Sequence, residues 1–341
     1  MKASLCRIVL IVIAFCSQAN PQTVLAQAVA DFYKGKTITL ITPDAAGSGY
    51  DAYGRLIGRF IGEYIPGKPN VVVQNMPGAG GVIQMNHMYN VAVKDGTVFG
   101  IMMHGALFRP IFDSREVRYK IDGFRWLGSV TAIDVIGAFN KDAPAKTASE
   151  LFEREVIIGG SGGTTVYLPK SINGILQAKM KLINGYKSTT DILLAMERKE
   201  VSGVVGIGLD SIQTSKAGGS VDNFNILFQM GAARSPALPD VPLIQEFAKN
   251  PDDKATLEAI FASFSIGRVF GAPAIPEDRY KALQEAFEKT VKDPNFVEAA
   301  QKQRSTVGYV SPAQIEKIIT TVYGQPEKII QRAASAIAEG P

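Results

Sequence analysis

Apolar residues along this chain alternate between short runs typical of buried strands and longer segments with helical spacing. Residues 38–41 (ITLI) form an apolar, β-rich run that predicts a strand. The next segment, PDAAGSG (43–49), holds a proline and glycines that cannot continue the strand. From Tyr50 onward a helix is predicted by apolar side chains at Tyr53, Leu56, Ile57, Phe60, Ile61 and Tyr64. The pattern therefore predicts a strand, a glycine loop and a helix in that order.

The same unit recurs about a hundred residues later. Residues 156–158 (VII) predict a strand, and 159–165 (GGSGGTT) predict a loop. The following segment, VYLPKSINGILQAKM (166–180), predicts a helix with Pro169 near its first turn, where a proline is tolerated. A helix that begins after a glycine loop presents unpaired N–H groups and the positive end of its dipole, which together favour an anion. Two such units indicate two domains that offer helix N-termini to one shared ligand.

The remaining pattern continues the alternation of strands and helices, which is typical of an α/β fold with largely parallel sheets. Further strands are predicted at 70–75, 126–130, 135–140, 201–208 and 225–231, and residues 94–103 predict a turn followed by a buried strand. Further helices are predicted at 82–91, 149–154, 191–199, 277–292, 294–303 and 312–339. No long linker separates the two predicted domains, so we expect the chain to cross between them on ordered segments near 128–135 and 262–270. The first domain would then be discontinuous, and the crossings would act as hinges.

The N-terminus has the features of a cleavable secretory signal. Lys2 and Arg7 precede an apolar core at 8–15, and cleavage is expected after Ala28 or, less favourably placed, after Ala26. Residues 1–28 are therefore predicted to be a signal peptide, and the periplasm is the expected compartment. A lipoprotein is disfavoured because Phe15, not a small residue, precedes Cys16. Removal of the signal would also remove Cys6 and Cys16, so the mature chain would lack disulfides, zinc thiolates and a cysteine nucleophile.

Charge and composition exclude several classes of function. The chain has 36 basic and 32 acidic residues, without the basic face that nucleic-acid binding requires. It has two histidines and no H-E-x-x-H motif, so no metal site and no cofactor are expected. His87 and His104 are interpreted as structural residues.

Several motifs in order along the chain resemble the Bug family, the periplasmic solute receptors of tripartite tricarboxylate transporters. The matching segments are PDAAGSGYD (43–51), VVVQNMPGAGG (71–81), KDGTV (94–98), GGSGGTTVYL (159–168), GYKSTTD (185–191), RSPALPDVP (234–242), FGAPAIP (270–276) and KDPNF (292–296). The resemblance covers nearly all of the mature chain. It implies a two-lobed, Venus-flytrap binding protein whose lobes are mostly parallel sheets flanked by helices. It implies residues 29–130 plus 265–341 in lobe 1 and residues 131–264 in lobe 2.

By this resemblance, the protein is a monomeric receptor that captures a small organic carboxylate between its lobes and delivers it to membrane transporter subunits. It would not be an enzyme. The candidate ligand-binding residues are Ala46, Gly47, Ser48, Gly49, Tyr50, Asp51, Asn75, Gly160, Ser161, Gly162, Gly163, Thr164, Thr165, Tyr167, Tyr186 and Asp210. Asp51 has helix capping or bracing of the loop as an alternative role, Asp210 has helix capping, and Asn75 has loop shaping. The two tyrosines 167 and 186 are equally typical of core or rim positions.

Departures from the family pattern bear on the ligand. Asp44 stands where the family has an apolar residue, Ser48 replaces a glycine, and Tyr50 and Tyr167 replace smaller or imidazole side chains. An extra acid near an anion site would repel a second carboxylate, and tyrosines would stack on an apolar body. These changes favour a monocarboxylate or an aromatic acid over citrate.

Two other classes of function remain open. Gly159–Gly163 matches G-x-S-x-G between a strand and a helix, the context of a serine hydrolase nucleophile at Ser161. Both histidines precede this serine, which excludes the order found in α/β-hydrolases. The order found in subtilisin or in chymotrypsin would still allow His87 or His104, but no further feature supports either triad, so a hydrolase is disfavoured. A ligand-sensing adaptor for a signalling system would share the same fold and the same site.

Overall fold

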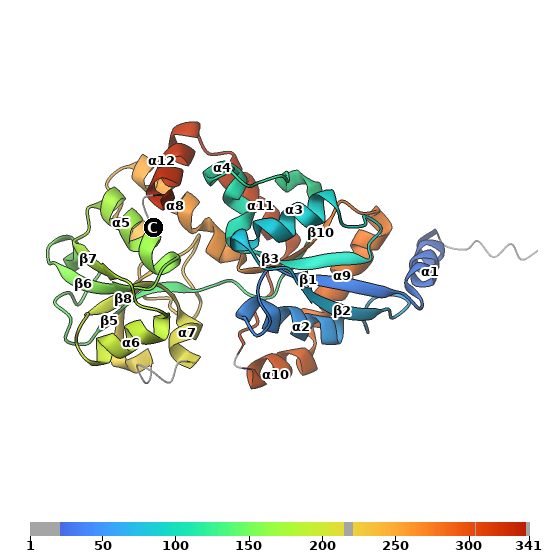
Figure 1. Cartoon of the computed structure of the whole chain (residues 1–341), viewed down its shortest axis with the longest axis horizontal. Coiled ribbons are helices and arrows are strands. Elements are labelled where there is room, and N and C mark those ends of the chain that lie inside the picture. The colour runs from blue at the N-terminus through green and yellow to red at the C-terminus, as the bar shows by residue number, and fades with distance from the viewer. Residues whose placement is uncertain (1–20, 215–220, 304, 339–341) are drawn as a thin grey trace, which may run out of the picture.

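The computed structural model describes residues 21–214, 221–303 and 305–338, which form two lobes built on separate sheets (Figure 1). Residues 1–20, with most of the expected signal peptide and both cysteines, lie outside the described residues. Helix α1 (Pro21–Tyr33) contains the rest of the expected signal, and its residues Ala26 and Ala28 are exposed. No helix in the described ranges is long and apolar enough to cross a membrane.

The sheet of the first lobe has the strand order β2-β1-β3-β10-β4. Its strands are β1 (Thr37–Thr42), β2 (Asn70–Asn75), β3 (Val98–Met103), β4 (Phe124–Ser129) and β10 (Arg268–Pro273). Strand β1 pairs in parallel with β2 and β3, whereas β10 is antiparallel to both β3 and β4.

The sheet of the second lobe repeats this arrangement in the order β7-β6-β8-β5-β9. Its strands are β5 (Val135–Asn140), β6 (Val156–Gly160), β7 (Met180–Asn184), β8 (Gly203–Gly208) and β9 (Phe224–Met230). Strand β6 is parallel to β7 and β8, and β5 is antiparallel to β8 and β9. Each sheet thus has four strands in one direction and one reversed strand, which confirms the predicted two-lobed α/β fold.

The reversed strands explain how the lobes face each other. Residues 130–134 leave the carboxyl end of β4 and enter β5 beside the carboxyl end of β8. The returning chain enters β10 beside the carboxyl end of β3. Because both crossings join one carboxyl edge to the other, the carboxyl ends of the parallel strands in both lobes lie toward the connection, where ligands bind in open α/β sheets.

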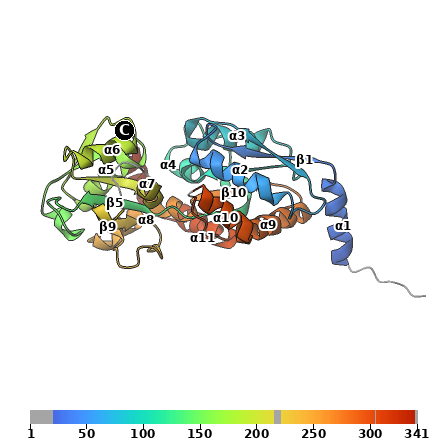
Figure 2. The same ribbon diagram turned by 90° about the horizontal axis from the view of Figure 1, so that it is seen from below.

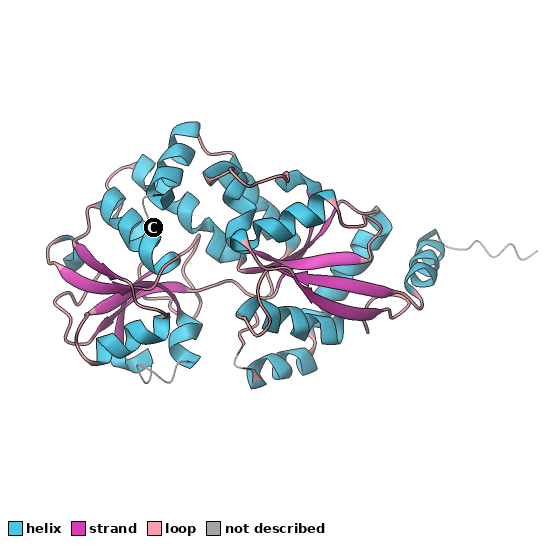
Figure 3. Cartoon of the chain, in the orientation of Figure 1, coloured by secondary structure: helices cyan, strands magenta, loops and turns pink. Residues whose placement is uncertain are grey.

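Helices cover both faces of each sheet (Figure 3). In the first lobe these are α2 (Gly49–Ile61), α3 (Val82–Asn90), α4 (Arg109–Phe112), α9 (Glu277–Lys292), α10 (Pro294–Lys302) and α11 (Pro312–Tyr323). In the second lobe they are α5 (Thr164–Leu176), α6 (Thr189–Glu197), α7 (Leu209–Thr214) and α8 (Pro251–Phe261), and the C-terminal helix α12 (Glu327–Ala338) packs against α5 and α8. Figure 2, from below, shows α9, α10 and α11 along one edge of the first lobe, while Figure 1 shows α10 and α11 on opposite faces of its sheet.

One hydrophobic core joins the two lobes on a single side. It runs from Val82 and Met85 on α3, through Phe264 near the second crossing, to Ile172 on α5 and Ala333 on α12. On the opposite faces the cores are separate: one lies under α2 and α9, and the other lies under α6 and α7. The lobes are therefore fused on the α3–α8–α12 side and independent on the α2–α7 side.

Two predicted elements differ from the structure. The helix predicted over 166–180 ends at Leu176, because Gln177 adopts a left-handed conformation (φ 60°), and the chain then forms the edge strand β7. The helix predicted over 312–339 is broken between α11 and α12 at residues 324–326, where Pro326 disfavours helical geometry in the preceding residue. In both cases the apolar spacing continues past a residue that ends the helix, so the spacing alone predicts a helix that is too long. The lobe boundaries expected at 131 and 264 stay a prediction.

Gly206 on β8 allows the start of α5 to lie directly on the sheet. Its φ is +89°, and a Cβ there would lie 2.4 Å from the Thr164 carbonyl oxygen. We expect Gly206→Ala to lower the free energy of unfolding by about 2–3 kcal/mol, because the energy cost of the positive φ and the cost of the clash with Thr164 add together. Gly174→Ala, in α5 with open space around the new methyl group, is the matched control and should be neutral or stabilising. Equal urea-unfolding midpoints for the two variants would contradict this prediction.

Candidate functional site

Two helix N-termini begin at the facing carboxyl edges, each after a glycine loop. Helix α2 follows β1 through residues 43–48, and α5 follows β6 through residues 161–163. Ser48 is the N-cap of α2, and its Oγ accepts a hydrogen bond from the Asp51 N–H at 3.2 Å. The N–H groups of Gly49 and Tyr50 have no hydrogen-bond partner among the described residues. This helix end is thus open to an acceptor from outside the chain.

A buried carboxylate braces the first loop. Asp51 is 3% exposed, and its Oδ2 accepts a hydrogen bond from the Gly47 N–H at 2.8 Å. Arg55 Nε donates to the same oxygen at 2.9 Å, and Asn75 Nδ2 donates to Oδ1 at 2.8 Å. The carboxylate is therefore engaged by the loop, its own helix and the end of β2.

These contacts set the ionisation of Asp51. Burial by itself raises the pKa of this carboxyl group, but the hydrogen bonds from Arg55, Gly47 and Asn75 outweigh burial and hold the pKa at about 2. Asn75 adds bonds from Nδ2 to Thr42 Oγ1 and to the Asp44 carbonyl, each at 2.8 Å. Asp51 and Asn75 were both predicted to contact the ligand. In the structure, the carboxylate of Asp51 and the Nδ2 of Asn75 make hydrogen bonds that hold the loop.

A buried hydroxyl braces the second loop in the same way. Thr165 Oγ1 accepts from the Ser161 N–H at 2.9 Å and donates to the Gly162 carbonyl at 2.8 Å. Thr165 is 4% exposed. In both loops, the N–H of a loop residue donates a hydrogen bond to a buried side chain four residues later in the chain. The two lobes therefore use one device with different chemistry, a carboxylate in lobe 1 and a hydroxyl in lobe 2.

The remaining loop residues are the more accessible part of the site. Exposed positions are Ala46, Gly47, Gly49, Gly162 and Gly163, and half-buried positions are Ser48, Ser161 and Thr164. Gly160 is buried, and its carbonyl accepts from the N–H groups of Gly185 and Tyr186. Gly47 and Gly162 have φ values of +85° and +106°, which turn the backbone in a way that glycine favours.

The predicted tyrosines differ in their surroundings. Tyr50 is 7% exposed, and its ring lies under the Arg268 guanidinium. Tyr167 is half-buried against the core that joins the lobes, and burial raises the pKa of its hydroxyl. Tyr186 packs beside the core under α6. Asp210, in the first turn of α7, accepts from the Ser211 N–H at 2.8 Å.

Residues beside the first loop were missed by sequence reasoning. Arg268 opens β10 and places its guanidinium carbon 4.1 Å from the Tyr50 ring centroid. His104 follows β3, its N–H lies 3.4 Å from the Tyr50 hydroxyl, and its buried Nδ1 has no partner among the described residues. Burial, followed by the nearby Arg268 charge, lowers the pKa of His104 to about 3, so its ring is neutral at pH 7. No motif in the sequence pointed to Arg268, because nothing local ties it to residues 43–51.

The arrangement around Ser161 does not supply a triad. Its Oγ lies 3.4 Å from Thr165 Oγ1, while His87 lies on α3 and His104 follows β3, both in the other lobe. The described residues also contain no cluster of three or more His, Cys, Asp or Glu side chains able to hold a metal ion.

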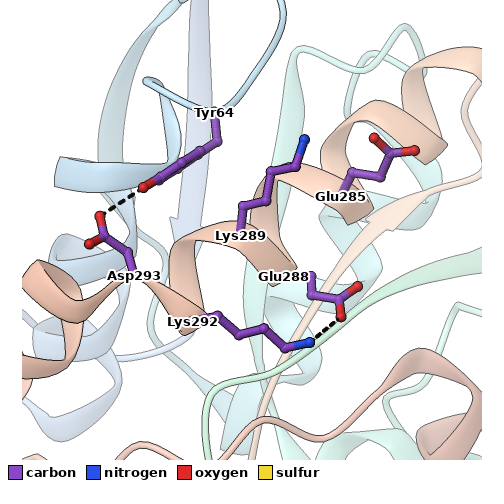
Figure 4. A pocket seen from close by; sticks show the side chains of 6 residues that line it. All are labelled: Tyr64, Glu285, Glu288, Lys289, Lys292 and Asp293. Atoms are coloured by element: carbon purple, nitrogen blue, oxygen red, sulfur yellow. Dashed lines mark hydrogen bonds and ion pairs between the residues drawn. The ribbon is translucent and has the colours of Figure 1, made fainter.

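A surface pocket lies away from the glycine loops. Figure 4 shows its lining, which comes from α9, from Asp293 and from Tyr64 beyond the C-terminal end of α2. The Tyr64 hydroxyl donates to Asp293 at 2.9 Å, and Lys292 pairs with Glu288. The loops occupy the opposite end of α2, so this pocket is separate from the candidate site.

The hydrogen bonds of Asp51 should contribute measurably to the free energy of unfolding. Asp51→Ala removes the acceptor of the Gly47 N–H and of Asn75 Nδ2 and ends a charge-assisted bond from the exposed Arg55, so we expect a loss of about 1.5–3 kcal/mol in the free energy of unfolding. Thr165→Val, the matched change in lobe 2, should cost about 1–2 kcal/mol because a neutral bond is lost. Urea unfolding at pH 7 measures both. A smaller loss for Asp51→Ala than for Thr165→Val would contradict the charge-assisted brace.

Acid should destabilise the protein in two steps. The pKa of His104 is lowered from 6.5 to about 3, so its contribution is complete above pH 6.5 and is lost as the pH falls toward 3. The pKa of Asp51 is lowered from 3.8 to about 2, so its contribution is lost only below about pH 3.8. Between pH 7 and pH 5 we therefore expect His104→Gln to lose less stability than the wild type, measured by urea unfolding. An identical pH dependence would contradict the burial of a neutral ring.

Several proteins of known structure share this fold. A TctC solute-binding protein from Polaromonas is 16% identical, with a TM-score of 0.68, covering 90% of this chain and 99% of that chain. An R. palustris protein solved with adipate is 19% identical, with a TM-score of 0.58, covering 87% and 97%. MatC from Rhodopseudomonas palustris, solved with malate, is 18% identical, with a TM-score of 0.55, covering 89% and 99%. These similarities show a shared fold.

The family follows from the sequence match. Residues 66–334, most of the chain, match the family model described as the tripartite tricarboxylate transporter family receptor. The matched range includes most of both sheets and the second glycine loop. The resemblance to the Bug receptors is thereby confirmed, and the family and the fold are those of solute-binding receptors. This chain belongs to the tripartite tricarboxylate transporter receptor family.

Proposed function

We propose that this protein is a periplasmic receptor that binds a small organic carboxylate between its two lobes. The observation that carries the proposal is the pair of braced glycine loops at the facing carboxyl edges. Each loop leads into a helix of 13 residues, α2 or α5, whose first-turn N–H groups suit an anion. Asp51 and Thr165 hold the loops in position, so their backbone N–H groups need little reorganisation when the ligand arrives.

The ligand class is supported by proteins of the same fold. One neighbour was solved with adipate and another with malate, both of which are small carboxylates. A carboxylate is also the anion that unpaired helix N–H groups would accept without a dedicated cation. Asp44 directs its Oδ1 to the Ala45 N–H at 2.8 Å, which reduces the repulsion that its charge would exert on the ligand. Both mono- and dicarboxylates therefore belong in a ligand screen.

Export and delivery complete the proposal. The signal features at residues 1–28 would direct the chain to the periplasm, where a receptor of this family meets solutes. Closure of the lobes would take place on the α2–α7 side, where their cores are separate, and would shift an open–closed equilibrium. The closed form would then present a combined surface of both lobes to membrane transporter subunits. The protein performs no chemistry on its ligand.

A thermal-shift screen of the mature protein tests the ligand class. The panel would contain malate, adipate, citrate, acetate, benzoate and terephthalate, with glucose and glycerol as uncharged controls. A ligand that binds only the folded state adds about 2.7 kcal/mol to the free energy of unfolding when its concentration is a hundred times Kd. This added stability raises the melting temperature. We expect at least one acid to raise the melting temperature and neither uncharged compound to do so. Shifts with the uncharged compounds alone would overturn the proposal.

Variants of the two loops test whether one ligand contacts both lobes. We expect Gly47→Pro and Gly162→Pro each to weaken binding of the acid found in the screen by about 100-fold or more, since proline cannot adopt the positive φ at either position. Gly35→Pro is the matched control, because Gly35 also has a positive φ (+71°) in open space but precedes β1 at the other end of the strand. Calorimetric titration measures the affinities. Full binding by either loop variant would contradict a ligand shared by the lobes.

A further inference from the structure

Arg268 lies where the two lobes and the first glycine loop meet. It is the first residue of β10 and pairs with Met103 at the carboxyl end of β3. Its N–H donates to the Thr131 carbonyl at 3.0 Å, and its carbonyl accepts from the Val130 N–H at 3.1 Å. The backbone of this residue therefore ties the two crossing segments together. Its side chain starts from the carboxyl edge of the lobe 1 sheet.

The guanidinium packs onto the first turn of α2. Its central carbon lies 4.1 Å from the ring centroid of Tyr50 and 5.6 Å from that of Tyr53. One guanidinium nitrogen, Nη2, lies 3.4 Å from the point that a Cβ on Gly49 would occupy. The guanidinium therefore lies close to the first residue of the helix. Two aromatic rings hold it there.

This position is electrostatically unfavourable for a cation. The N-terminal end of a helix carries a partial positive charge, which repels a guanidinium. No carboxylate lies within ion-pair distance of Arg268 in the described part of the chain. By contrast, the neighbouring Arg55 pairs with Asp51 at 2.9 Å, and Arg125 on the adjacent strand β4 pairs with Glu277 at 3.5 Å. Arg268 is half-buried, so solvent compensates its charge only in part.

An external anion would complement the unmatched donors of Arg268 and of the first turn of α2. A carboxylate between the guanidinium and the first turn of α2 would accept hydrogen bonds from Arg268 and from the free N–H groups of Gly49 or Tyr50. A planar carboxylate fits the guanidinium fork in a way that a neutral polar group does not. We propose that Arg268 binds a carboxylate group of the ligand and makes this receptor selective for anionic over uncharged solutes. The inference rests on the proposed function and assigns its charge selectivity to one side chain.

The position of Arg268 also links binding to the hinge. The same residue that contacts the ligand bonds to residues 130 and 131 of the first crossing, directly after Gly267 of the second. Gly267 has a φ of +41°, and a Cβ there would lie 2.1 Å from the Thr131 carbonyl oxygen. A ligand held by this arginine therefore lies against the point where both crossings are joined.

Substitution of Arg268 tests the assignment, with Arg125 as the matched control. Arg125 also lies over a tyrosine ring, Tyr280 at 5.3 Å, in the same sheet, but it is at the start of β4 and far from the glycine loops. Wild type, Arg268→Gln, Arg268→Lys and Arg125→Gln would be titrated with malate, adipate, benzoate and acetate by calorimetry. We expect Arg268→Gln to weaken the tightest of these acids by about 10–100-fold, the loss expected for a charge-assisted hydrogen bond. Arg268→Lys should recover part of the affinity, and Arg125→Gln should match the wild type.

Each other outcome has a distinct meaning. Wild-type affinity in Arg268→Gln would overturn the role of Arg268 while leaving the carboxylate receptor in place. No binding of any of the four acids by the wild type would overturn both the proposed function and this inference. Urea unfolding of each variant shows whether the protein is folded. If Arg268→Gln is unfolded, Arg268→Met, which keeps the aliphatic packing against Tyr50, takes its place with the same expected loss.

Discussion

Two of the segments that connect the lobes, residues 130–134 and residues 262–267, constrain the rest of the structure. Each one joins a carboxyl edge of one sheet to the carboxyl edge of the other, so the strand that receives it must run against its neighbours. This requirement places β5 and β10 in reversed orientation and turns both glycine loops toward the same region. The loops are then held by the ends of β1 and β6, and the helices that follow present their N-termini there. The position of the site is therefore a consequence of how the chain crosses.

The hydrophobic cores determine which side of the molecule is able to move. A continuous core runs through α3, α8, α5 and α12. Beside it, the hydrogen bond from Tyr323 to the Leu107 carbonyl braces its lobe 1 part, and the Arg332–Asp253 ion pair joins α12 to α8 in lobe 2. The cores under α2 and under α6 have no such connection. A motion that keeps the joint core packed would open and close the α2–α7 side, since buried contacts are costly to break.

The electrostatics of the first loop separate two roles that the sequence could not distinguish. Asp51 is acidic and lies beside the candidate anion site, yet its charge is balanced by Arg55 and by hydrogen bonds from Gly47 and Asn75. Arg268, on β10, is basic, packs on Tyr50 in the first turn of the same helix, and has no ion-pair partner among the described residues. The first loop is therefore held by an internally balanced brace, while the arginine beside it is the cation that we propose to meet an external anion. With that proposal, a strongly acidic side chain can lie close to a bound carboxylate.

The sequence by itself determined the local units and the class of fold. Apolar periodicity and glycine positions predicted both strand–loop–helix units, because strand and helix formation depend on neighbouring residues. The edge strand β7 and the break before α12 were missed, since single residues such as Gln177 and Pro326 override the periodicity. Only the tertiary structure decided that Asp51 braces the loop and that Arg268 lies on Tyr50. The Asn75–Asp51 and Arg268–Tyr50 contacts join residues far apart in the chain, and their partners are set by sheet order and by the crossings, which no local pattern records.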